Sequence, residues 1–88
     1  MKIKQGFVMR DVVGQAVAIA TGEASKSFHG MVKLNDTGAV IWNGIEKGLD
    51  EAEIAEQLAA GYDVEADQAL KDVESFIARM RDAGLVEG

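Results

Sequence analysis

The feature that most constrains the fold of this chain is a change in the spacing of its apolar residues near residue 35. Before that point, short runs are rich in branched and aromatic residues or alternate apolar and small side chains, as β-strands do. After it, apolar residues recur every three or four positions, as in amphipathic helices. Because the chain has only 88 residues, this order predicts one α+β domain in which a small sheet precedes several helices.

The first 34 residues predict a three-stranded antiparallel meander. Gly14-Gln15 provides a two-residue turn between the first two strands, and a polar loop over residues 22–27 precedes the third. The expected strands span residues 7–13, 15–21 and 28–34.

The remainder of the chain predicts three helices. Asn35 or Asp36 supplies the N-cap of the first, and Asp50 with Glu53 three residues later forms a capping-box-like pair for the second. Asp63 opens the longest helix. Two helices joined by a tight turn resemble a helix-turn-helix, and the small sheet resembles the wing of a winged helix-turn-helix domain. The expected helices span residues 36–47, 51–60 and 64–83, and we expect one domain over residues 1–88.

The apolar residues of both halves predict a single core. Trp42 is expected to anchor the first helix to the sheet. On the third helix the central stripe contains Leu70, Val73, Ile77 and Met80, with Phe76 at its border, and a stripe of this kind is more often core than ligand surface. The residues expected to join sheet and helices are Leu34, Val40, Ile41, Ile54, Leu58, Val73, Ile77 and Leu85.

Composition argues against catalysis and against metal or cofactor binding. The chain has no cysteine and a single histidine, His29. It therefore lacks a thiolate nucleophile and a thiolate metal site, and no Gly-Lys-Ser/Thr phosphate loop is present. We expect no catalytic residue, no metal and no cofactor. The longest apolar stretch, residues 16–20, is far shorter than the roughly 20 residues of a membrane span, so we expect a cytoplasmic protein that does not bind membranes.

A winged helix that binds DNA is the alternative interpretation, and the distribution of charge argues against it. The formal net charge is −6. Residues 63–83, the helix that would enter the major groove, carry six acidic and three basic residues. A net charge of −3 on a recognition helix would repel the phosphate backbone, so we expect no nucleic-acid partner.

The order and spacing of several short motifs resemble the PqqD-like family, named for protein D of pyrroloquinoline quinone biosynthesis. The resemblance implies a non-catalytic domain that binds the leader segment of a ribosomally made precursor peptide as an added strand. It also implies presentation of the leader to a modifying enzyme, often a radical S-adenosylmethionine enzyme. The motifs are Leu34-Asn35-Asp36-Thr37-Gly38-Ala39-Val40-Ile41-Trp42, Glu53-Ile54-Ala55 with Leu58, Tyr62-Asp63, Asp72-Val73, Phe76-Ile77 and Gly84-Leu85-Val86.

The third strand and the third helix carry the candidate peptide-binding residues. An edge strand offers unpaired backbone N–H and C=O groups to a partner. A loop or a second copy of the chain could instead cover that edge, and a domain this small could form a homodimer by exchanging elements. A helical wheel does not decide which flank of the helix faces the strand. The candidates are Phe28, His29, Gly30, Met31, Val32, Lys33 and Leu34 on the strand, and Asp67, Leu70, Glu74, Ile77, Ala78 and Arg81 on the helix.

Overall fold

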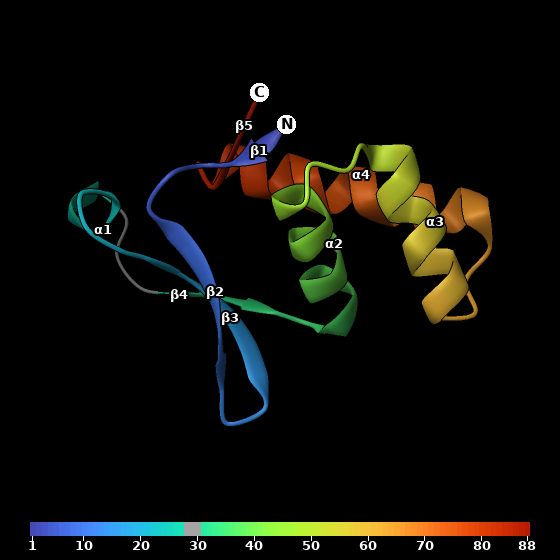
Figure 1. The fold of residues 1–88 in the computed structure, drawn as a ribbon, viewed down its shortest axis with the longest axis horizontal. Helices are drawn as coiled ribbons and strands as arrows, with labels where there is room; N and C mark the ends of the chain where they lie inside the picture. The colour runs from blue at the N-terminus through green and yellow to red at the C-terminus, as the bar shows by residue number, and fades with distance from the viewer. Residues whose placement is uncertain (28–30) are drawn as a thin grey trace.

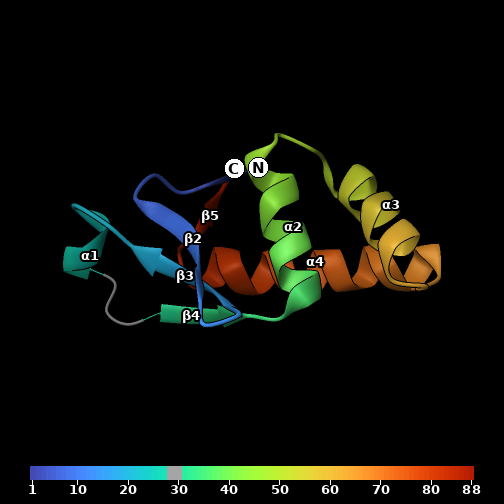
Figure 2. The same ribbon diagram turned by 60° about the horizontal axis from the view of Figure 1, so that its bottom comes forward.

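A computed structural model describes residues 1–27 and 31–88 of the chain, and it confirms an α+β fold with a three-stranded antiparallel sheet. Figure 1 shows the sheet at one end of a layer in which α2 and α3 lie against the long α4, and Figure 2 shows the same arrangement turned by 60°. The elements are β1 (Lys2–Ile3), β2 (Phe7–Val12), β3 (Gln15–Ala20), α1 (Ala24–Ser27), β4 (Met31–Leu34), α2 (Asp36–Glu46), α3 (Glu51–Gly61), α4 (Ala66–Asp82) and β5 (Val86–Glu87).

The order of strands in the main sheet is β2-β3-β4, with both pairs antiparallel. The turn between β2 and β3 is one residue earlier than the sequence predicted. Val12 pairs with Gln15, so the turn consists of Val13 and Gly14, with φ of 52° and 78°. Positive φ at both central residues defines a type I′ turn, whose twist matches that of the flanking strands. The third expected strand is described from Met31 onward, and Phe28 to Gly30 lie outside the described residues.

The strand register divides the side chains of this sheet between two faces, because partners opposite one another in a ladder project on the same side. The inner face packs against the core and carries Phe7, Met9, Ala16, Ala18, Ala20, Val32 and Leu34. The outer face carries Val8, Arg10, Val12, Gln15, Val17, Ile19, Met31 and Lys33.

The N-terminal caps of α2 and α3 form as the sequence predicts. Asn35 Oδ1 accepts a hydrogen bond of 2.8 Å from the backbone N–H of Gly38. In α3, Asp50 Oδ1 accepts from Glu53 N–H at 2.8 Å, and Glu53 Oε1 accepts from Asp50 N–H at 3.1 Å. These bonds satisfy N–H groups that the first helical turn leaves without an intrahelical partner.

Helix α4 differs from the prediction in its start and in its buried stripe. It begins at Ala66 after the N-cap residue Glu65, whose side chain makes no capping bond, while Asp63 has a positive φ of 47°. Leu70, which the sequence placed in the core stripe, is 36% exposed, and Ala69 is buried in its place. The buried stripe is therefore rotated by one residue at this end of the helix relative to the predicted one. The buried residues of α4 are Ala69, Val73, Phe76, Ile77 and Met80.

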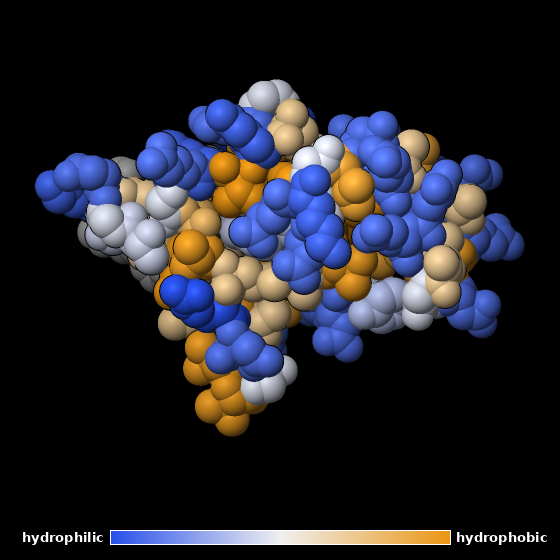
Figure 3. All heavy atoms as spheres, in the orientation of Figure 1, coloured by the Kyte–Doolittle hydropathy of each residue, from blue (hydrophilic) through white to orange (hydrophobic). Residues whose placement is uncertain are grey.

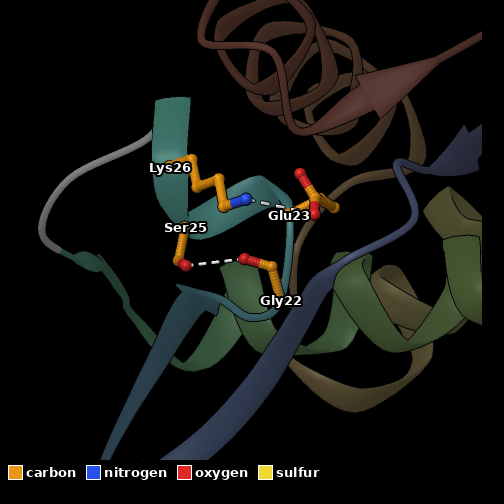
Figure 4. Close-up of polar contacts among 4 residues, drawn as sticks. All are labelled: Gly22, Glu23, Ser25 and Lys26. Atoms are coloured by element: carbon orange, nitrogen blue, oxygen red, sulfur yellow. Dashed lines mark hydrogen bonds and ion pairs between the residues drawn. The ribbon is translucent and has the colours of Figure 1, made fainter.

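Three short elements that the sequence did not predict, namely β1, β5 and α1, complete the fold. β1 pairs with β5 in a second, two-stranded antiparallel sheet that joins the two ends of the chain. The turn into α1 is held by a bond of 2.6 Å from Ser25 Oγ to the carbonyl of Gly22 and by an ion pair of 3.3 Å between Lys26 and Glu23 (Figure 4). Strands of two residues have too little periodicity to be recognised in a sequence.

The core joins the inner face of the sheet to all three long helices. Trp42 is fully buried, as are Ile54, Leu58 and Leu85. Of the eight residues expected to form the core, seven are buried, and Val40 is half-buried against it. Within the described residues, no helix is long and apolar enough to cross a bilayer.

Candidate functional site

The outer edge of β4 carries the backbone groups that are free to pair with a peptide. β4 is bonded to β3 on one side and is the last strand of the sheet. In the described part of the chain it therefore has an open edge, as a strand-addition site requires.

The register decides which amides of β4 face this edge. In a two-residue hairpin the pair that closes the turn, here Val12 and Gln15, is hydrogen-bonded, so the backbone groups of Gln15 point to β2. Orientation alternates along a strand, so Ala16 and Ala18 point to β4, where they oppose Leu34 and Val32.

Met31 and Lys33 consequently direct their N–H and C=O groups outward, whereas Val32 directs its own toward β3. Gly30, another candidate on this strand, lies outside the described residues. Met31 and Lys33 each offer one backbone donor and one backbone acceptor to a partner strand, which suffices for about four ladder hydrogen bonds.

A groove of about 340 Å³ adjoins this edge and separates β4 from α4. Gln15 Nε2 donates to the carbonyl of Leu34 at 2.7 Å, which fixes the end of β4 at the groove. A second hollow of about 250 Å³ continues along α4 and shares Asn35, Phe76 and Arg79 with the first. The residues that line the first hollow are Gln15, Val32, Lys33, Leu34, Asn35, Phe76, Arg79 and Met80.

The groove combines an apolar floor with basic side chains at its rim. Phe76 and Met80 are buried at 5% and 7% exposure and form the floor. Lys33 and Arg79 are exposed, and neither forms an ion pair with another described residue. These two basic side chains suit a carboxylate of a bound segment, while Asp72 borders the adjoining hollow that shares Arg79.

The structure brings together only some of the predicted site residues. Val32, Lys33 and Leu34 line the groove, and Met31 lies on the same edge. On α4, Ile77 is 1% exposed and belongs to the core. The flank that faces β4 is the one bearing Phe76 and Arg79, while the other predicted residues are exposed and line neither hollow: Asp67, Leu70, Glu74, Ala78 and Arg81.

Sequence reasoning missed three groove residues of α4, namely Phe76, Arg79 and Met80. Phe76 gave a signal, because it stood at the border of the predicted stripe. Arg79 lies three positions further along, so it shares a helix face with Phe76. The aromatic residue at the stripe border therefore marked the flank that faces β4.

Another hollow, of about 730 Å³, has a lining that shares no residue with this groove. It is bordered mainly by polar residues from the loop after β1 and from the turn before α1. Among the described residues, no three His, Cys, Asp or Glu side chains are grouped as a metal site would require. The residues lining it are Lys4, Gln5, Gly6, Thr21, Gly22, Glu23, Ala24 and Glu87.

An open strand edge beside a groove, on a small sheet followed by three helices, defines an α+β domain of the winged-helix type. The chain belongs to the family of coenzyme PQQ synthesis protein D (PqqD), whose sequence profile matches residues 13–86. Comparison with curated protein sequences gives no significant match.

Two solved structures share the fold. One is described as TbiB1 in complex with the TbiA(beta) leader peptide, with a TM-score of 0.82 and 24% identity over 100% of this chain and 96% of that one. The other is lasso peptide synthetase B1 complexed with the leader peptide, with a TM-score of 0.81 and 20% identity over 99% of this chain and 96% of that one.

Proposed function

We propose that this protein is a recognition module that binds the leader segment of a ribosomally made precursor peptide. The leader adds a fourth strand to the sheet along β4. The observation that carries the proposal is the open edge of β4 above the groove formed with α4. Membership of the PqqD family and the fold shared with two proteins solved with leader peptides support it.

In this binding mode, backbone hydrogen bonds supply affinity and side chains of the leader supply specificity. Backbone bonds to Met31 and Lys33 form with any peptide that can extend beside them. Side chains of an added strand alternate between faces, so every second leader residue enters the groove next to Val32 and Leu34. The floor of Phe76 favours an apolar residue, and the rim favours an acidic one.

The domain has no activity of its own in this proposal and hands the leader to a modifying enzyme. As the family resemblance implies, that enzyme is of the radical S-adenosylmethionine type. We place the complex in the cytoplasm, as expected from the sequence. Nucleic acid is not a partner, because α4 carries four acidic and three basic residues and would repel phosphate. A homodimer would bind the leader only if it left the β4 edge uncovered.

Two substitutions at one position test strand addition. Lys33→Pro removes the outward N–H, and proline is tolerated on an edge strand where that group does not serve the internal ladder. Lys33→Ala keeps the N–H and removes only the charge. Val32→Pro is unsuitable, since the Val32 amide faces β3 and its loss would damage the sheet itself.

Binding of a fluorescent leader peptide is measured by anisotropy after circular dichroism shows that both variants are folded. Lys33→Pro should weaken binding by about 1–3 kcal/mol, the cost of an unsatisfied partner group. Lys33→Ala should cost only about 0–1 kcal/mol, as an exposed ion pair does. Equal losses in the two variants would mean that the leader does not pair with this edge.

A further inference from the structure

The outer face of the main sheet, which points away from the helices, carries several apolar side chains that are partly or largely exposed. Val12 is 48% and Met31 is 57% exposed, and Val8 and Ile19 are half-buried. None of these four side chains projects toward the helices, because the register places them opposite the inner face. Figure 3 shows that the hairpin formed by β2 and β3 projects from the body and ends in an apolar tip.

The tip of that hairpin holds a residue that is unfavourable for the isolated protein. Val13 is 100% exposed and has a φ of 52°. A β-branched side chain in the left-handed region is strained, and Asn or Asp is the usual choice at this turn position. The side chain is not buried within the described chain, so its packing does not offset this strain, and strain of this kind is common at functional sites.

Charge selects the kind of partner. Val17 is 2% exposed, and Arg10 and Lys33 lie opposite it on either side. Their charged ends remain exposed without an ion-pair partner among the described residues. No acidic residue lies on the outer face of the described strands. A second copy docking face to face would bring like charges together, which disfavours self-association.

We propose that the outer face and the Val13 tip form a docking surface for a protein that presents an apolar patch flanked by carboxylates. Resting on the proposed function, we infer that this protein is the enzyme that modifies the bound leader. The groove lies on the inner side of the sheet, so a partner on the outer face leaves it accessible, although Lys33 adjoins both surfaces. Leader and enzyme can therefore bind at the same time.

The same geometry predicts coupling between the two ligands. A leader strand beside β4 places alternate side chains next to Met31 and Lys33 on the outer face. The docking surface thereby grows from three strands to four. The enzyme should bind the loaded domain more tightly than the free one, and the leader should gain the same factor in the presence of the enzyme.

The test uses two outer-face variants on β2 and its turn, remote from the leader edge. Arg10→Glu reverses a charge and Val13→Asn removes the exposed apolar side chain while suiting the turn. Asp11→Asn is the matched control, since Asp11 projects from the same strand to the opposite face. Binding to the purified modifying enzyme is measured by interferometry, and leader binding is measured separately by anisotropy.

Both outer-face variants should lose about tenfold or more in affinity for the enzyme, as substitutions of interface anchors do. Their affinity for the leader should be unchanged. The control Asp11→Asn should bind the enzyme about as tightly as the wild type does. If both variants bound the enzyme as tightly as the wild type and still bound the leader, the proposed docking surface would be wrong and the proposed function would stand. Failure of the wild type to bind leader would instead overturn the proposed function. A stable dimer that dissociates on Val13→Asn would show that a second copy occupies this face.

Discussion

Replacing Val13 by Asn should make this protein more stable. The residue sits in a type I′ turn with a φ of 52°, and its side chain is 100% exposed. The left-handed conformation costs an ordinary L-residue about 1–2 kcal/mol. Asn tolerates that conformation, and Asn-Gly is a preferred sequence for the turn.

The expected gain in stability equals the strain that is relieved, because the substitution removes no buried apolar contact. Since the valine side chain is fully exposed, its removal forfeits no buried apolar area. We therefore expect a net gain of about 1 kcal/mol in the free energy of unfolding. For a domain of this size that gain corresponds to a rise of about 4–8 °C in melting temperature.

Urea and thermal unfolding followed by circular dichroism measure the change, with Val12→Asn as the matched control. Val12 occupies the adjacent strand position and is 48% exposed. The control loses partial burial and β-propensity, so it should lower stability by about 1 kcal/mol. If the two variants change stability in the same direction, the turn is not strained as described and the physical argument for the docking tip fails.

Two further substitutions test the packing of the helices. Ile77→Ala should cost about 2–5 kcal/mol in urea melts, because Ile77 is 1% exposed in the core; a cost near zero would place that side chain at the surface. Gly44→Ala should destabilise, because its Cβ would lie 2.7 Å from Ile54 Cγ1 and overpacking costs about 1–3 kcal/mol. As a control, Gly61→Ala should raise the free energy of unfolding by up to about 1 kcal/mol, because its Cβ would meet no atom within 4 Å. If Gly44→Ala were the more stable of these two variants, the packing of α2 on α3 would be contradicted.

Most of the fold could be predicted from the sequence, because its long elements carry strong local signals. The capping box of Asp50 and Glu53 and the cap at Asn35 mark helix starts through short-range bonds that depend on neighbouring residues alone. The turn was misplaced by one residue, because Val13 is an improbable residue at positive φ and Gly14 is compatible with either register. Sequence-based prediction of a turn fails where the residue present is one that the local backbone conformation disfavours.

The site was predictable in kind and only partly in its residues. The β4 edge followed from the number and order of strands. The flank of α4 that faces it depends on how the helices pack on one another and on the sheet, which a helical wheel does not contain. The outward orientation of Met31 and Lys33 likewise required the register set by the hairpin turn, two strands away.

Amide hydrogen exchange of β4 during titration with the leader peptide tests strand addition most directly. The amides of Met31 and Lys33 face the open edge and should exchange more slowly as the leader binds. The amide of Val32 already faces β3 and should change little, which gives an alternating pattern within one strand. Slowed exchange confined to α2 and α3, or no change at Met31 and Lys33 at saturating leader, would contradict the account.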